Sequence, residues 1–247
     1  MEDRKRTALA AVITCVVLAA VLYSFFRNLI PSGPALVLAD PNAVASMEPG
    51  VQASDGVAVE VTPQTVQSLV ASLERYESYS RAVTVEYFSN GQPVGTASAQ
   101  VWTDGGWTRC DLTLSSGMVE HSIVGEGRLW LWYAGDERVY TGPAEDMTAD
   151  LMQRLPTYET VLELDKRSIT GAGYEVREEQ PCVYVEARTP ELGYLERYWI
   201  SESSGLLMAA EVEKDGAVVY SMTSREIVSP LDQTGQVFTL PDGTELR

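Results

Sequence analysis

The fold is decided by residues 83–91, which read VTVEYFSNG. Apolar and polar residues alternate from Val83 to Tyr87, and this period of two is typical of a strand with one apolar face. Asn90-Gly91 follows, and this dipeptide favours a tight hairpin turn because both of its positions adopt positive φ. We therefore predict a hairpin whose return strand covers residues 92–103.

The same alternation recurs further along the chain, interrupted by turn residues such as Gly105-Gly106 and Asp215-Gly216. Short sequential strands separated by turn signals indicate an antiparallel meander rather than a parallel sheet. The further predicted strands cover residues 107–115, 118–125, 128–134, 138–141, 174–179, 182–188, 194–201, 206–214 and 217–228. The sequence thus predicts a mainly β (α+β) fold with about eleven strands.

Helical segments are predicted before and within this series of strands. Thr62-Pro63 suits the start of a helix, with an N-cap residue followed by proline at the first helical position. The apolar residues from Val66 to Tyr76 then recur with the spacing of one helix face over about four turns. A short helix over residues 143–155 and a helical turn over residues 158–164 interrupt the strands.

The predicted strand at residues 129–133, LWLWY, carries apolar side chains on both of its faces. An antiparallel sheet often leaves one face in water, so this strand requires cover on both sides. A sheet curled around a helix, or around an apolar ligand, would supply that cover.

The N-terminal region contains an almost continuous apolar run from Ala8 to Phe26. A helix of about 20 apolar residues crosses a bilayer, and the basic residues before the run keep the N-terminus in the cytoplasm. We expect a cytoplasmic tip (residues 1–7), a transmembrane anchor (8–26), a flexible linker (27–61) and an extracytoplasmic domain (62–247) of the cell membrane. A signal peptide cleaved near Ala43-Val44-Ala45 is the alternative.

The chain is strongly acidic, with 35 Asp and Glu residues against 18 Lys and Arg residues and a net charge of −17. Phosphate backbones repel such a chain, so we expect no nucleic-acid partner. Cys110 and Cys182 are the cysteines of the predicted extracytoplasmic domain. An oxidising compartment permits a disulfide between them, and two buried free thiols in apolar strands are the alternative.

The sequence contains no recognised catalytic or metal-binding motif. His121 is the only histidine, so a Ser-His-Asp or Cys-His site would depend on it, and a half-exposed strand residue is the simpler interpretation. One histidine and two distant cysteines do not form a zinc-binding pattern, and phosphate-binding and metalloprotease motifs are absent. We expect no catalytic residue, no metal and no cofactor, and therefore a protein that is not an enzyme.

Three segments resemble LolA-like proteins. Residues 124–133, followed by 138–140, resemble the family's mid-chain hairpin, in which a glycine precedes an aromatic strand. Residues 198–207, followed by 213–216, are similar to its hairpin with an Asp/Ser-x-x-x-Gly-Leu turn, and residues 237–243 are similar to its closing Phe-x-x-Pro segment. The three segments occur in the family's order after an opening helix, so the resemblance covers residues 62–247.

This resemblance implies an unclosed, strongly curved antiparallel half β-barrel wrapped around helices, with an apolar inner face. The LolA/RseB-like superfamily includes periplasmic lipoprotein carriers, RseB-type regulators that bind lipoproteins and an anti-sigma factor, and GerS-type lipoproteins of spore germination. Such a fold does not by itself decide the function. A chain fixed by a transmembrane helix cannot shuttle between membranes, which leaves local lipid handling or regulation of a partner.

Aromatic and methionine side chains in or beside the predicted strands are candidates for lining an apolar cavity, because large rings and thioethers adapt to flexible ligands. Ordinary core packing is the alternative for each of them. The candidate cavity residues are Trp102, Trp130, Trp132, Trp199, Met208 and Met222. Met147, Leu151 and Met152, in the helical insertion, are candidates for a lid or for the contacts of a surface helix.

Two functions are compatible with these observations. The first is a membrane-anchored extracytoplasmic protein that binds a lipid or a lipoprotein acyl chain in its half-barrel cavity. The second is a protein-interaction module that regulates an envelope or cell-wall enzyme, or a signalling protein, without a lipid ligand. An empty apolar cavity open to solvent favours the first, whereas a filled interior with an exposed apolar patch or sheet edge favours the second.

Overall fold

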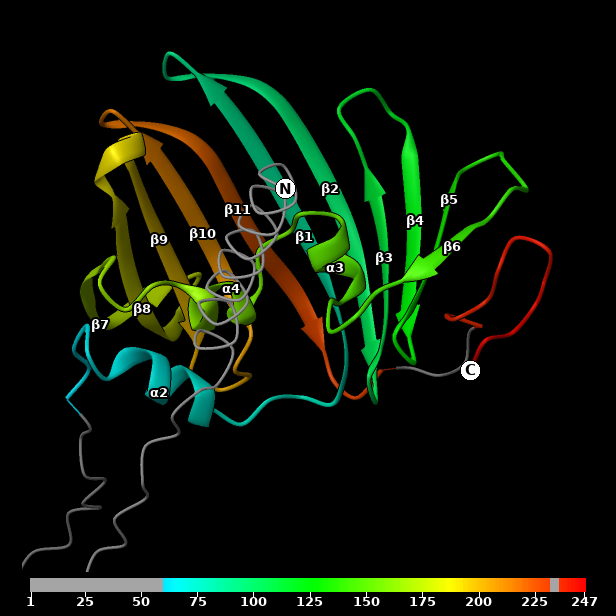
Figure 1. Cartoon of the computed structure of the whole chain (residues 1–247), viewed down its shortest axis with the longest axis horizontal. Coiled ribbons are helices and arrows are strands. Elements are labelled where there is room, and N and C mark those ends of the chain that lie inside the picture. Colours follow the sequence, from blue (N-terminus) through cyan, green and yellow to red (C-terminus); the bar gives the residue numbers. More distant parts are fainter. Residues whose placement is uncertain (1–59, 232–235) are drawn as a thin grey trace, which may run out of the picture. The chain divides into compact units, whose positions relative to one another are not determined.

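The computed structural model of the chain describes residues 60–231 and 236–247 (Figure 1). The predicted cytoplasmic tip, the predicted anchor at residues 8–26 and the linker up to residue 59 lie outside the described residues. Within the described part, the structure contains no helix that is both long and apolar enough to span a bilayer.

A single antiparallel sheet of eleven strands forms most of the described chain. Its strands are β1 (Ser78–Ser89), β2 (Gln92–Asp104), β3 (Trp107–Thr113), β4 (Val119–Gly125), β5 (Arg128–Tyr133), β6 (Tyr140–Pro143), β7 (Ile169–Arg177), β8 (Gln180–Thr189), β9 (Tyr194–Ser201), β10 (Leu207–Lys214) and β11 (Ala217–Val228). The mainly β fold is thereby confirmed, and the largest difference from the predicted strands is at β7, which begins at Ile169 rather than at residue 174.

The sheet is open and consists of two meanders that pair through β1 and β11. Its order is β6-β5-β4-β3-β2-β1-β11-β10-β9-β8-β7. Apart from β1 and β11, all neighbouring strands are also consecutive in sequence. At the junction between the meanders, Val85 of β1 lies opposite Met222 of β11. The two edges of the sheet are the short strand β6 and the longer strand β7, and this open arrangement matches the expected half-barrel.

The β1–β2 hairpin forms as the sequence predicts. Asn90 and Gly91 have φ values of 51° and 73°, and the residues on either side of them pair across the turn. Val83 and Val85 lie opposite Ala99 and Ala97 in this register, and all four side chains are buried. The alternation seen in the sequence therefore places one apolar face of the hairpin in the core.

Helix α2 (Val66–Ser72) is shorter than predicted. Its N-cap is Thr65 rather than Thr62, and Leu73 is already extended with ψ of 135°. The Arg75 guanidinium folds back and donates hydrogen bonds to the carbonyls of Val70 and Leu73. This side chain satisfies carbonyl groups that are left open at the helix end. The chain then turns towards β1, which leaves Tyr76 outside the helix and 40% exposed.

Residues 144–168, which we call the crossing segment, connect the two edges of the sheet. Strand β6 ends at Pro143 at one edge, and β7 begins at Ile169 at the other. The segment contains α3 (Ala149–Met152) and α4 (Tyr158–Glu163), so the predicted helix over residues 143–155 is reduced to about one turn. Figure 1 shows α2, α3 and α4 over the same face of the sheet, which we call the helix-covered face.

The main core lies between the helix-covered face and these helices. Val66 and Val70 of α2, Ala149 of α3 and Val161 of α4 belong to one buried cluster with side chains of the sheet. The buried sheet residues of this cluster include Val83, Val85, Val101, Cys110, Leu112, Val183, Val185, Ile200 and Met222. The strands of both meanders are therefore held together by the same helices.

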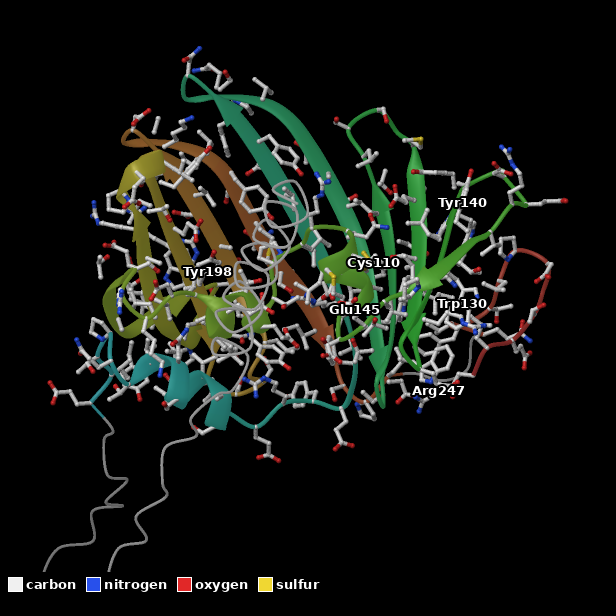
Figure 2. The ribbon with its side chains drawn as sticks, in the orientation of Figure 1. Cys110, Trp130, Tyr140, Glu145, Tyr198 and Arg247 are labelled. Atoms are coloured by element: carbon white, nitrogen blue, oxygen red, sulfur yellow. The ribbon has the colours of Figure 1, made fainter. Side chains whose placement is uncertain are left out.

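The opposite face of the sheet carries a second apolar cluster, which we call the tryptophan cluster. Ile123, Trp132 and Phe238 are buried there, and Trp107, Trp130, Val139, Val237, Leu240 and Leu246 pack against them. Residues 236–247, the C-terminal segment, thus cover the tryptophans, and Trp130 lies beside this segment in Figure 2. The LWLWY strand is covered by the main core at Leu129 and by the tryptophan cluster on its other face. The chain itself supplies both covers.

Candidate functional site

The six candidate cavity residues do not form one site. Met222 alone belongs to the main core, where it is fully buried. Trp130 and Trp132 belong to the tryptophan cluster. Trp102 shares the guanidinium of Arg109 with Trp132, at 5.5 Å from its own ring and 5.7 Å from that of Trp132. Trp199 and Met208 form a further buried cluster with Cys182 and Ala209. A shared role in ligand binding remains a prediction for these residues.

The three lid candidates belong to the crossing segment. Met147 precedes α3 and is 43% exposed. Leu151 and Met152 lie within α3 and are half-buried, and Met152 packs against the main core. The structure therefore places all three in the segment that crosses the helix-covered face. A lid must be able to move, so the attachment of this segment to the sheet decides whether it can act as one.

Helix α3 is attached to the sheet by hydrogen bonds that lie in the core. The backbone N–H of Ala149 donates to Thr108 Oγ1 at 2.7 Å. Ser122 Oγ donates to the carbonyl of Ala149 at 3.4 Å, and Gln153 Nε2 donates to Ser122 Oγ at 3.2 Å. All of these groups are buried, so separating α3 from β3 and β4 would break three buried hydrogen bonds and leave the N–H of Ala149 without its partner.

Helix α4 is attached to α2 through one glutamine. Gln67 Nε2 lies 2.9, 3.1 and 2.9 Å from the carbonyl oxygens of Val161, Leu162 and Leu164, and its two N–H groups are shared among these three acceptors. These carbonyls lie at the C-terminal end of α4, where no intrahelical donor is available. A side-chain amide that is itself 9% exposed therefore fixes the end of the crossing segment.

A buried ion pair provides the third attachment. Arg81 of β1 and Asp150 of α3 are 2% and 3% exposed, and Arg81 Nη2 lies 2.6 Å from Asp150 Oδ2. Arg81 Nη1 also donates to the carbonyl of Leu207 at 3.3 Å, and Asp150 Oδ1 accepts from Thr148 and from the N–H of Leu151. Burial opposes the charged form of Arg81, but Asp150 outweighs this effect and raises the pKa of the guanidinium.

Sequence reasoning missed this pair, although a signal for it was present. Arg81 stands two residues before Val83 and four before Val85, so it shares the apolar face of β1. A charged residue in phase with buried residues requires a buried partner. That partner comes from the crossing segment, a connection across the sheet that no local pattern indicates.

A pocket of about 180 Å³ lies next to the ion pair. It is lined by Arg75, Tyr76, Tyr79, Arg81, Thr103, Gly106, Thr108, Thr148, Asp150, Thr157, Tyr158, Glu159, Leu206 and Leu207. The guanidinium of Arg75 lies 3.7 Å from the centre of the Tyr158 ring. Burial raises the pKa of Tyr79, with Arg81 opposing this effect. The lining therefore combines aromatic rings with charged and hydroxyl groups.

Outside the pocket, His121 is the titratable group that the sequence singles out. His121 stacks on Trp132 with the ring centres 5.2 Å apart, and its Nδ1 lies 2.9 Å from Asp111 Oδ1. The pKa of Asp111 is lower than usual. Burial acts to raise this pKa, but the hydrogen bonds from His121 and Arg109 have the larger combined effect. Among the described residues, no group of three or more His, Cys, Asp or Glu side chains is arranged to hold a metal ion.

The two cysteines of the described domain are free thiols. Cys110 lies in the main core and Cys182 lies in the cluster around Trp199, so they pack against different sets of residues. Burial raises the pKa of Cys182 to about 11 and that of Cys110 well above its usual value. The structure thus corresponds to the alternative with two buried free thiols.

No protein-family model matches the sequence, and no curated protein matches it. Among solved structures, the chain is similar to MucB in complex with MucA(peri), with a TM-score of 0.40 and 13% identity over 63% of this chain. That match spans about half of the MucB chain, 52%. A lipoprotein of Mycobacterium tuberculosis, LppX, has a TM-score of 0.38 and 10% identity, with 68% of this chain and 95% of LppX covered.

A LolA superfamily protein from Nitrosomonas europaea is also matched, with a TM-score of 0.33 and 11% identity. This match covers 75% of the present chain and 98% of the other.

Proposed function

We propose that the chain is a non-catalytic binding module at the outer side of the cell membrane, which recognises a protein partner rather than holding a lipid inside its sheet. The predicted anchor at residues 8–26 would fix it to the bilayer. The predicted linker at residues 27–61 would allow the domain to stand away from the lipid surface. The observation that carries this proposal is the filled interior of the sheet.

The helix-covered face is occupied by the chain's own residues. The crossing segment contributes Ala149, Leu155 and Val161 to the main core, and it is attached by the bonds of Thr108, Gln67 and Arg81 described above. The pocket that remains beside Arg81 has a volume of about 180 Å³, whereas sites for small molecules usually measure about 300–1,000 Å³. A long acyl chain would have to displace the crossing segment.

Lipid binding remains the second candidate, because the crossing segment covers an apolar surface. Ala149, Leu155 and Val161 of the segment share the main core with side chains of both meanders, such as Val85, Val101, Cys110 and Ile200. That surface is continuous across the β1–β11 junction, and an acyl chain is a chemically suitable replacement for the helices. The two candidate functions therefore differ in whether the crossing segment stays packed on the sheet or moves away from it.

A photo-crosslinker at the pocket mouth distinguishes the two candidates in the host cell. We would replace Tyr76, which is 40% exposed, by p-benzoylphenylalanine and identify the crosslinked species by mass spectrometry. The matched control is the same replacement at Tyr140, which is 60% exposed on the edge strand β6. A discrete protein adduct at position 76 alone supports the proposal. A lipid adduct at position 76 alone contradicts it and supports the second candidate.

A further inference from the structure

We propose that the pocket beside Arg81 binds an uncharged amide group of the partner, such as an Asn or Gln side chain. This inference rests on the proposed function, because it names the chemical group by which a protein partner would enter the pocket. Three features of the lining support it: a buried donor without a partner, a balance of charges, and a size that fits one side chain.

The buried donor is the Nε–H of Arg81. The side chain of Arg81 is 2% exposed and lines the pocket. Its two Nη groups bond to Asp150 and Leu207, whereas its Nε has no hydrogen-bond partner among the described residues. A buried guanidinium N–H without a partner is unfavourable. This Nε is closed to solvent in the structure, so an oxygen acceptor would reach it by displacing neighbouring side chains of the lining and would then form a charge-assisted hydrogen bond.

The charges of the lining favour an uncharged ligand. Arg75 and Arg81 are balanced by Asp150 and Glu159 in the same lining. A carboxylate or phosphate placed among them would add a buried charge with no counterion of its own. A neutral carbonyl accepts the Arg81 hydrogen bond without that penalty.

An amide fits the lining better than an ester does. The lining contains carboxylates as well as donors, and an amide offers both a carbonyl oxygen and N–H groups, whereas an ester offers acceptors only. The volume of about 180 Å³ is large enough to admit a carboxamide side chain, and Leu206 and Leu207 supply apolar surface for its methylene groups.

The test uses three small probes of the same number of non-hydrogen atoms: butyramide, butyrate and methyl propionate. The full chain, labelled with ¹⁵N at arginine and held in detergent micelles, is titrated with each probe, and the Nε–H signal of Arg81 is followed by NMR. We expect butyramide to shift this signal in a saturable way. Binding of butyrate and of methyl propionate should be about tenfold weaker, because each lacks part of the neutral donor and acceptor pattern.

Paired substitutions provide the variants, because removing both charges of a buried pair preserves folding better than removing one. Arg81→Met/Asp150→Leu should abolish saturable butyramide binding and identifies the Arg81 signal by its loss. The matched control is Arg177→Met/Glu211→Leu, which removes an ion pair of 2.7 Å that lies outside the pocket. This control should bind butyramide as the unaltered chain does.

Three results would overturn the inference. An unchanged Arg81 signal at saturating butyramide would mean that the pocket holds water only. Equal binding of methyl propionate would point to an ester, as in a glycerolipid, and equal binding of all three probes would show that the pocket does not discriminate. If the Arg81→Met/Asp150→Leu variant fails to fold, comparing the saturable shifts that the three probes cause among all arginine Nε–H signals of the unaltered chain decides these points. Uptake of a whole lipid would instead contradict the proposed function itself.

Discussion

At Gly125 the backbone of β4 lies close against Trp107 of the tryptophan cluster. A Cβ atom at this position would lie 2.2 Å from Cε3 of Trp107, because the indole lies directly against β4. Gly125→Ala should therefore displace Trp107, which stacks on Trp130 at 5.8 Å. We expect a loss of at least about 1–3 kcal/mol in the free energy of unfolding, measured by urea denaturation followed by tryptophan fluorescence.

The control for this substitution is Gly142→Ala on the neighbouring strand β6. A Cβ atom there meets nothing within 4 Å, so the free energy of unfolding should change by less than about 0.5 kcal/mol. Equal effects of the two substitutions would show that Trp107 does not pack against Gly125 as described.

Asp150 tests whether the buried ion pair attaches the crossing segment. Asp150→Asn would leave the charge of Arg81 buried without its counterion, and we expect a loss of about 3–5 kcal/mol in the free energy of unfolding. Asp136→Asn is the control, because its pair with Arg138, whose side chain is 80% exposed, lies at the surface and should contribute little. Thermal unfolding of both variants by circular dichroism would measure this difference, and similar stabilities would contradict the account.

The two buried thiols predict a specific pattern of alkylation. Thiolates rather than thiols react with iodoacetamide, and burial raises the pKa of Cys182 to about 11. At pH 8 the folded chain should leave Cys110 and Cys182 unmodified, and both should react after denaturation without a reductant, as read by peptide mass spectrometry. Protection that persists in denaturant would instead indicate a disulfide.

At the scale of single residues, the sequence indicates whether a side chain is buried better than it indicates on which face of the sheet the side chain lies. In the LWLWY strand both alternating sets are apolar, so the pattern is equally compatible with the tryptophans facing the helices or facing away. The covering residues of the C-terminal segment decide the matter, and their contact with Trp130 and Trp132 is remote in sequence. Arg81 is the reverse case, since its phase with Val83 is a signal of burial that sequence reasoning left unused.

At the scale of the elements, Gln67 is the residue that joins α2 to the crossing segment. Gln67→Ala would leave the carbonyls of Val161, Leu162 and Leu164 without this donor. A buried polar group without a partner lowers the free energy of unfolding by about 1–3 kcal/mol. Hydrogen exchange in α4 should become faster while exchange in β1 and β2 stays unchanged. Gln64→Ala, an exposed glutamine just before α2, is the control, and faster exchange there as well would argue against a specific contact.

The strands were predictable because their signals are local. Alternation and turn residues such as Asn90-Gly91 are short-range patterns, and they gave the meanders and most strand limits correctly. The end of α2 was not predictable, since it depends on the Arg75 side chain folding back over carbonyls. The β1–β11 pairing and the path of the crossing segment also lay beyond local patterns, because both connect residues far apart in the chain.

At the scale of the whole domain, the proposed function depends on the crossing segment remaining in place. If α3 and α4 stay seated, the sheet has an occupied interior and binds partners at its surface or at the pocket beside Arg81. If they leave, both meanders present one apolar surface that suits an acyl chain. The fold is compatible with either behaviour, and the position of the crossing segment decides between them.

The most direct measurement is native mass spectrometry of the full chain, released from detergent after incubation with bilayer lipids and with a lipidated peptide. Denaturation of the same sample then recovers any bound molecule. Our account predicts the mass of the chain alone, with no retained lipid. A discrete adduct with the mass of an acylated ligand, present in the native state and lost on denaturation, would show that the interior opens and would contradict the account.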